Sequence, residues 1–97
     1  MDLQVHSVHF DADKKLIDFI NGRVSKLETF VDNIILGEVF LKLDKASDSE
    51  NKVAEIRLKI PGKELFAKKQ CKSFEEATDQ ACEALRSQAI KHKGKVK

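Results

Sequence analysis

Apolar and polar residues alternate in four short stretches of this chain, at residues 2–8, 37–45, 53–60 and 64–71. In GEVFLKLDK, for example, Val39 is followed by apolar residues at every second position. A period of two places one side of the backbone against a core and the other towards solvent. The pattern therefore predicts four strands, the last two joined as a hairpin through the turn-forming pair Pro61-Gly62.

Between the first two strands the period changes to three and four residues. Asp13 can cap a helix at its N-terminus, and the predicted helix covers residues 14–31. Gly22 weakens this prediction slightly, since glycine inside a helix costs about 1 kcal/mol relative to alanine. The apolar stripe consists of Leu16, Ile17, Ile20, Val24, Leu27 and Val31.

A second helix is predicted from the SFEE stretch onward. Ser73 followed by Glu76 matches a capping box, in which each side chain bonds the backbone N–H of the other residue. We expect the helix to run to about Lys91 or Lys93 and Gly94 to terminate it. Its apolar stripe consists of Phe74, Ala77, Ala81 and Leu85, with Cys82 and Ala89 beside it.

The predicted order is β-α-β-β-β-α, and the 97 residues are enough for one domain, residues 1–97. One sheet must bury an apolar face, and two amphipathic helices can cover it, which gives an α+β two-layer sandwich. The first strand is expected to pair with the second, with the hairpin extending a four-stranded sheet. The opposite sheet face would then present Phe40, Lys42, Arg57, Lys59, Phe66 and Lys68.

Composition narrows the class of protein. No apolar stretch has the length of a membrane span, and the N-terminus lacks the pattern of a signal peptide, so a cytoplasmic protein is expected. The two cysteines, Cys71 and Cys82, fit no metal-binding spacing. In a reducing compartment they are expected as small buried side chains and not as a disulfide.

Enzyme signatures are missing from the sequence. It shows no glycine-rich phosphate loop, and His6 and His9 would point to opposite faces of a strand, so a shared metal is not expected. Acidic residues at the start of the second helix are explained by its dipole, and Cys82 by packing in the core. We therefore expect no catalytic residue, no metal, no cofactor and no small-molecule substrate.

Charge is distributed unevenly along the chain. Residues 1–50 contain 6 Lys and Arg against 10 Asp and Glu, whereas residues 51–97 contain 12 against 6. From Arg86 to the C-terminus there are five basic residues and no acid. Basic residues on two adjacent helices would suit a partner rich in phosphate, because lysines neutralise phosphates with little regard to sequence. The alternative is that these residues are solvated helix faces.

Several stretches together resemble a known family. They include Lys26-Leu27-Glu28, the strand VFLKLDK, the turn Pro61-Gly62 and the helix start SFEEATDQA. The most specific is the ending with Leu85, Gln88 and KHKGK, which is similar to an L-x-x-Q-x-x-K-H-K-x-K pattern. In order and spacing they resemble the short ribosome hibernation-promoting factors and ribosome-associated inhibitors, also called the sigma-54 modulation protein family.

The resemblance implies a fold like that of a double-stranded RNA-binding domain. It also implies binding to the small ribosomal subunit, in the channel for messenger and transfer RNA, with basic residues of both helices against ribosomal RNA. Such a factor blocks translation in starved or stationary cells. Long members have a C-terminal dimerisation domain that this chain is expected to lack, so pairing of ribosomes would need another protein or would not occur.

Carried onto this chain, the resemblance assigns RNA contacts to the basic residues of the two helices and the tail. Two positions that are often basic in the family are Ala84 and Ser87 here. Arg86 offers a replacement for the lost charge, although on a helix it points about 100° away. The candidate RNA-binding residues are Arg23, Lys26, Arg86, Lys91, His92, Lys93 and Lys95.

A second hypothesis is a protein-binding modulator of a transcription factor, as the sigma-54 label implies. Its contact surface would be the exposed sheet face with Phe40 and Phe66. Salt-insensitive binding to a protein, with none to ribosomes, would favour this hypothesis, and salt-sensitive binding to ribosomes would favour the first.

Overall fold

The structure is a computed structural model that describes residues 1–46 and 49–95, with side chains as far as Lys91. The element order is β-α-β-β-β-α, as the sequence predicted. A single turn of 3-10 helix, η1, directly follows the first helix. The bounds are β1 Asp2–Ser7, α1 Lys14–Ser25, η1 Lys26–Thr29, β2 Leu36–Leu43, β3 Lys52–Ile60, β4 Lys63–Cys71 and α2 Phe74–Lys95.

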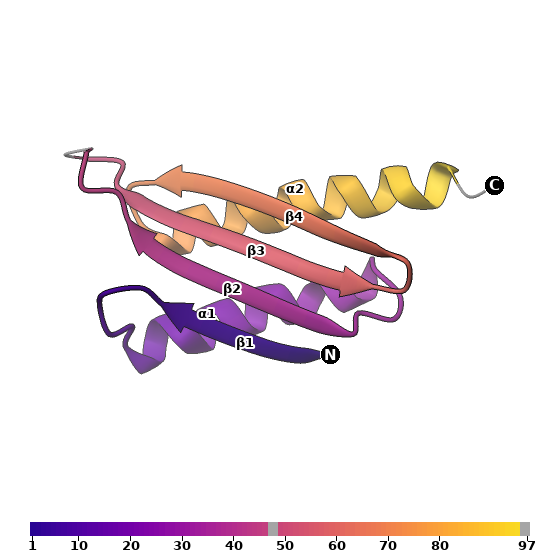
Figure 1. Cartoon of the computed structure of the whole chain (residues 1–97), viewed down its shortest axis with the longest axis horizontal. Helices are drawn as coiled ribbons and strands as arrows, with labels where there is room; N and C mark the ends of the chain where they lie inside the picture. The colour runs from indigo at the N-terminus through magenta and orange to yellow at the C-terminus, as the bar shows by residue number, and fades with distance from the viewer. Residues whose placement is uncertain (47–48, 96–97) are drawn as a thin grey trace.

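The four strands form one sheet in the order β1-β2-β3-β4 (Figure 1). β1 runs parallel to β2, and the other neighbouring pairs are antiparallel. A parallel pair needs a long connection between its strands, and α1 provides it. The pairing of the first two strands and the extension of the sheet by the hairpin are both confirmed.

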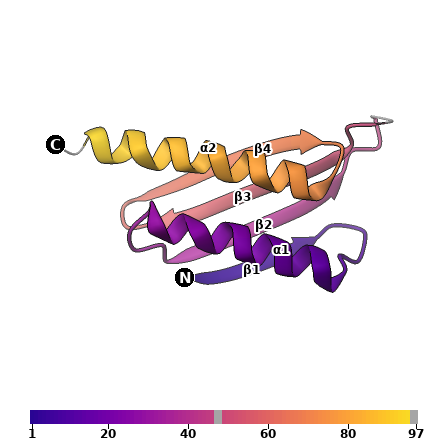
Figure 2. The ribbon, with the colours of Figure 1, turned by 180° about the vertical axis from the view of Figure 1, so that it is seen from behind.

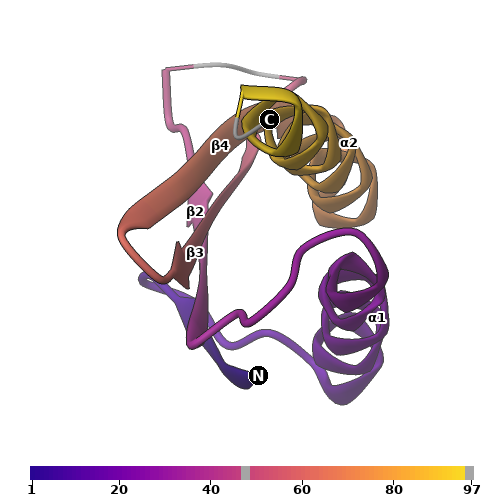
Figure 3. The ribbon, with the colours of Figure 1, turned by 90° about the vertical axis from the view of Figure 1, so that its right-hand side faces the viewer.

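Both helices cover the same face of the sheet and lie side by side (Figures 2 and 3). They run in the same direction, and the C-terminal end of α2 projects past the turn between β3 and β4 (Figure 1). The predicted two-layer α+β sandwich is therefore correct. In the described part of the chain, no helix is long and apolar enough to span a membrane.

The core lies between the sheet and the two helices, where the predicted apolar faces meet. Alternate residues of the central strands and the inward stripes of both helices are almost completely buried there. This burial fixes which helix faces remain outside. Its largest fully buried members are Ile20, Val24, Val39, Leu41, Ile56, Leu58, Leu65 and Leu85.

Both helices begin where the capping residues predicted. The Asp13 carboxylate accepts a hydrogen bond from the backbone N–H of Leu16 at 2.9 Å, and the Ser73 hydroxyl accepts one from that of Glu76 at 3.1 Å. These side chains satisfy donors that a helix start leaves without partners.

The predicted end of the first helix was wrong. α1 stops at Ser25, and Lys26–Thr29 tighten into η1, where the Thr29 hydroxyl donates to the Lys26 carbonyl at 2.8 Å. Leu27 in η1 and Val31, two residues beyond its end, are nonetheless buried, so the apolar stripe continues past the end of α1. The periodicity therefore predicted burial correctly and the helix type incorrectly.

The predicted end of the second helix was also wrong, since α2 passes through Gly94 to Lys95. A glycine disfavours a helix by only about 1 kcal/mol, which neighbouring helix-forming residues can offset. The Pro61-Gly62 turn is confirmed: Ile60 pairs with Lys63, and Gly62 has a φ of 75°.

Candidate nucleic-acid interface

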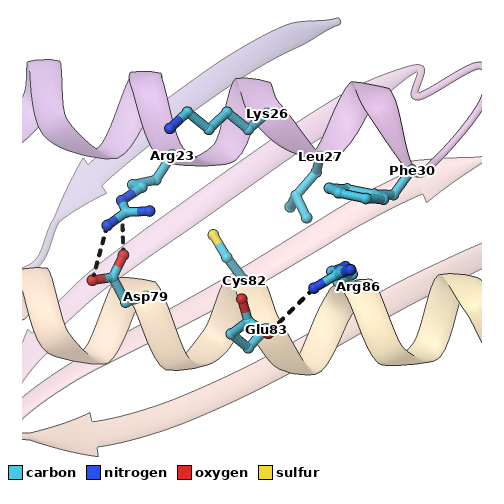
Figure 4. Close-up of a pocket in the computed structure, with 8 residues that line it drawn as sticks. All are labelled: Arg23, Lys26, Leu27, Phe30, Asp79, Cys82, Glu83 and Arg86. Carbon is cyan, nitrogen blue, oxygen red and sulfur yellow. Dashed lines mark hydrogen bonds and ion pairs between the residues drawn. The ribbon is translucent and has the colours of Figure 1, made fainter.

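A groove runs between α1–η1 and α2 on the outer side of the helical layer, with a volume of about 370 Å³ (Figure 4). Arg23, Lys26 and Arg86 all line it, although they come from three different elements. The structure thus brings together three of the residues predicted to bind RNA. The other lining residues are Leu27, Phe30, Asp79, Cys82 and Glu83.

The remaining predicted residues lie farther along α2. Lys91 is exposed, and among the described side chains no carboxylate forms an ion pair with it. The backbones of His92, Lys93 and Lys95 belong to α2, but their side chains lie outside the described part. Whether those three residues contact RNA stays a prediction.

Arg23 reaches from α1 across the groove to Asp79 on α2. Its Nε lies 2.9 Å from Oδ1, and its Nη2 donates to Oδ2 at 3.4 Å. The guanidinium also lies 5.4 Å from the centre of the Phe19 ring. Both members of the ion pair are partly exposed, so water and salt weaken their attraction.

Arg86 reaches across the same groove in the opposite direction. Its guanidinium lies over the Phe30 ring, 4.6 Å from the ring centre, and 3.9 Å from the Glu83 carboxylate. A cation over an aromatic face is attracted by the ring quadrupole. The two arginines therefore bridge the helices at separate points of the groove, with Cys82 between them (Figure 4).

The groove is less basic than the sequence predicted. The helical periodicity identified the cations, but it did not indicate that Asp79 and Glu83 would face them. Both acids lie on α2 at a spacing of four residues, so the signal was present in the sequence as one shared helix face. Three cations and two carboxylates leave a small positive excess.

Of the three cations that line the groove, Lys26 is the one without a nearby carboxylate partner among the described residues. It is exposed, and none of the ion pairs in the described part of the chain involves it. It starts η1 rather than continuing α1. A phosphate could therefore approach this lysine without displacing a protein carboxylate.

Cys82 and Leu27 contribute apolar surface to the groove. Burial raises the pKa of the Cys82 thiol to about 11, and the nearby Asp79 charge adds to this shift. The thiol is consequently neutral near pH 7 and unsuited to nucleophilic chemistry. Among the side chains that the structure describes, no group of three or more His, Cys, Asp or Glu residues could hold a metal ion.

Ala84 and Ser87, the two departures from the family pattern, lie away from this groove. They line a shallow depression on the other side of α2, beside Lys69 of β4. Arg86 lines the main groove and not this depression, so whether it replaces the missing charge in an RNA contact stays a prediction.

Gln88 has a structural role that sequence reasoning missed. Its side-chain amide donates to the backbone carbonyl of Phe66 at 2.7 Å. Phe66 lies on β4, an edge strand of the sheet, and the bond ties α2 to that edge. The spacing from Leu85 to Gln88, one helical turn, was the available signal.

The opposite sheet face presents aromatic and charged side chains, as expected. Phe66 is 42% exposed, with the Arg57 guanidinium 5.8 Å from its ring centre, and His6 stacks on Phe40 at 4.9 Å. Most of the charges on this face have partners. The ion pairs are Lys42–Glu55 at 2.9 Å, Arg57–Glu64 at 2.8 Å and Lys68–Glu55 at 4.0 Å.

A family model described as "Sigma 54 modulation protein / S30EA ribosomal protein" matches residues 3–97. The chain belongs to this family. Two relatives bear the name ribosome hibernation promoting factor. The protein from Klebsiella oxytoca is 29% identical over 97 residues, covering 100% of this chain and 98% of the relative. That from Pseudomonas putida is 28% identical over 95 residues, covering 98% of this chain and 89% of the relative.

Solved structures support the fold independently. The N-terminal domain of Thermus thermophilus Protein Y has a TM-score of 0.80 at 18% identity, covering 95% of this chain and 99% of the domain. A ribosomal subunit interface protein from Coxiella burnetii has a TM-score of 0.84 at 17% identity, covering 97% and 99% respectively. At these identities the likeness establishes the architecture alone.

Proposed function

We propose that this protein is a non-catalytic ribosome hibernation factor that binds the small ribosomal subunit in the channel for messenger and transfer RNA. The observation that carries this proposal is the convergence of Arg23, Lys26 and Arg86 on one groove between two helices. Family membership and the names of the relatives support the ribosome as the partner.

Its mechanism would be steric occlusion. A rigid two-layer domain held against ribosomal RNA fills space that messenger and transfer RNA need, and no bond is made or broken. Lysines and arginines supply binding free energy by neutralising phosphates and releasing their counterions. Lys26 and Lys91 are well suited to this role, since they are exposed and have no carboxylate partner among the described residues.

Cosedimentation with purified small subunits across a salt series tests this proposal. The double variant Lys26→Glu/Lys91→Glu replaces attraction by repulsion at two unpaired cations, and we expect it to lose binding at moderate salt. Lys59→Glu is a control for one charge reversal outside the groove, because this exposed lysine lies on the opposite sheet face, and each single variant, Lys26→Glu and Lys91→Glu, is compared with it. Binding by the double variant equal to that of the control would place the contact elsewhere.

A second candidate is a protein-binding modulator that acts through the sheet face, and the exposure of Phe66 favours it. Salt-insensitive binding to a protein partner that Phe66→Ser abolishes, without binding to ribosomes, would support this candidate. Loss of ribosome binding in Phe66→Ser, with the fold intact, would instead assign the sheet face to the ribosome.

A further inference from the structure

The carboxylate of Glu83 is an unexpected feature in a groove that is otherwise suited to phosphates. It lines the groove beside Arg86 and is exposed. A phosphate entering at this point would meet a like charge, which is unfavourable. The chemical group that fits beside Glu83 is one that donates hydrogen bonds.

A flat surface lies next to this acceptor. The Arg86 guanidinium lies over the Phe30 ring, 4.6 Å from the ring centre. Phe30 remains 36% exposed, so this cation–ring pair is open to the groove. Aromatic rings and guanidinium planes are the surfaces on which proteins stack unpaired RNA bases.

The size and the floor of the groove also suit a base. Its volume of about 370 Å³ lies within the usual range of small-molecule sites and is too small for a duplex. Leu27 and the neutral thiol of Cys82 supply apolar surface. Lys26 completes the lining with a cation that has no ion-pair partner among the described residues.

From this arrangement we infer that the groove binds one unpaired RNA nucleotide whose base presents an amino group on its pairing edge. The base would pack against Arg86 and Phe30, its amino group would donate to Glu83, and its phosphate would lie near Lys26. The inference rests on the proposed function and names the part of the RNA that this groove would take.

The chemistry predicts a preference for cytosine over uracil. The two bases have rings of equal size and stack similarly, but cytosine carries an amino donor where uracil carries a carbonyl acceptor. A carboxylate accepts a hydrogen bond from the amino group of cytosine and repels the carbonyl oxygen of uracil. Comparing these two bases therefore isolates the contribution of Glu83 from that of stacking.

Fluorescence anisotropy with end-labelled oligocytidine and oligouridine tests the inference on the full chain at low salt. We expect oligocytidine to bind about fivefold more tightly, the lower end of the discrimination given by a base-edge contact. Glu83→Gln should abolish that preference, because an amide can accept from cytosine or donate to uracil. Arg86→Lys should weaken both oligomers by about fivefold or more, since it keeps the charge and loses the flat surface.

Matched controls repeat each chemical change outside the groove. Glu75→Gln lies in the first turn of α2, and Arg57→Lys lies on the opposite sheet face. Neither should change the preference for cytosine, and circular dichroism establishes that all variants fold. The inference is overturned if the unaltered chain binds both oligomers equally or binds neither, or if Glu83→Gln keeps the preference.

The same variants in the small-subunit assay separate this inference from the proposed function. Salt-sensitive binding to subunits without a base preference means that the nucleotide site is wrong and the proposed function stands. A base preference without subunit binding means that the nucleotide site is right and the proposed function is wrong. If Glu83→Gln weakens subunit binding while the oligomers show no preference, the groove binds a cationic protein side chain instead, and the inference fails.

Discussion

Arg23 on α1 and Asp79 on α2 form an ion pair across the groove, with nitrogen–oxygen distances of 2.9 and 3.4 Å. The Asp79 carboxylate accepts from the Arg23 guanidinium nitrogens to which a phosphate oxygen would otherwise bind. Under the proposed function, Arg23 must therefore exchange a protein carboxylate for an RNA phosphate. This exchange makes Asp79 an internal competitor of the RNA.

Asp79→Asn should strengthen binding to small subunits, by up to about fivefold, because exposed ion pairs contribute about 0.2–1 kcal/mol. The free energy of unfolding should fall by less than about 1 kcal/mol for the same reason. Cosedimentation over a salt series measures the first effect, and urea denaturation measures the second.

Asp18→Asn is the matched control, since Asp18 also pairs with a cation, Lys14 at 2.9 Å, but does not line the groove. It should leave subunit binding unchanged. Weaker binding by Asp79→Asn would contradict the competition and indicate that Asp79 holds Arg23 in the orientation that RNA requires.

Gln88 should matter for stability and not for RNA contact. Its amide donates to the Phe66 carbonyl on the sheet edge, so Gln88→Ala should cost about 0.5–1.5 kcal/mol in the free energy of unfolding. Gln88→Glu should cost more near neutral pH, because a carboxylate cannot donate to the carbonyl. Urea denaturation measures both, with Gln80→Ala, an exposed residue of α2, as the control.

The fold could be predicted from the sequence because burial is a periodic property. Val39 and Leu41 alternate in a strand, and Ile20 and Val24 recur on a helix, so both patterns specify an inward face. The ends of helices depend on weaker effects, namely the local backbone preferences and the capping interactions of a few residues. At Lys26 the chain tightens into η1 while keeping Leu27 inward, and no period distinguishes those two geometries.

The candidate site was predictable only in part. Basic residues on two helices could be assigned to one surface once the layers were known, and Arg23, Lys26 and Arg86 do meet there. The shared face of Asp79 and Glu83 could be read from their spacing, but not which cation each would meet, because Asp79 meets Arg23 and Phe30 meets Arg86 only through tertiary contacts between elements far apart in the sequence. The pairing of helix faces, and not residue type, decides which cations remain unpaired.

Two glycines should respond to substitution in opposite directions. A Cβ would meet nothing within 4 Å at either Gly22 or Gly62, so the backbone alone decides the outcome. Gly22→Ala, inside α1, should stabilise the protein by about 0.5–1 kcal/mol. Gly62→Ala should destabilise it by about 1 kcal/mol or more, because φ is 75° there.

Thermal or urea denaturation of both variants checks these signs. Gly62→Asn serves as the control for backbone strain, since asparagine tolerates positive φ better than alanine and should cost less. If Gly62→Ala were as stable as the unaltered protein, the turn would have to adopt a different geometry in solution.

Because Cys82 is buried as a neutral thiol, we expect the protein to lose stability at alkaline pH. Burial raises its folded-state pKa from 9.0 to about 11, so the unfolded chain releases the proton first as pH rises. The stabilisation is complete below pH 9 and is lost as pH increases through about 11. Burial also raises the pKa of Cys71, which adds to the same trend.

Denaturation curves between pH 8 and 11 measure this loss, and Cys82→Ala should make it shallower by removing one of the two thiols. Native protein should react slowly with a thiol reagent near neutral pH and quickly after unfolding. Rapid alkylation of the native Cys82 would show that the groove exposes a reactive thiolate.

The C-terminal end of α2 should contribute phosphate contacts through its lysines. A chain ending at Ala89 keeps the buried residues Leu85 and Ala89, so we expect it to fold, but it loses the exposed Lys91 and the basic residues after it. We expect its binding to small subunits to weaken and its salt dependence to become shallower, by about one unit of slope for each lost phosphate contact.

A full-length variant with glutamine at Lys91, Lys93, Lys95 and Lys97 separates charge from helix length. Equal weakening in both variants would assign the contact to the charges, and weakening in the truncated chain alone would assign it to the shape of the helix end. If neither change affects binding, the helix end serves only solubility, and the groove with Arg23, Lys26 and Arg86 must carry the contact by itself.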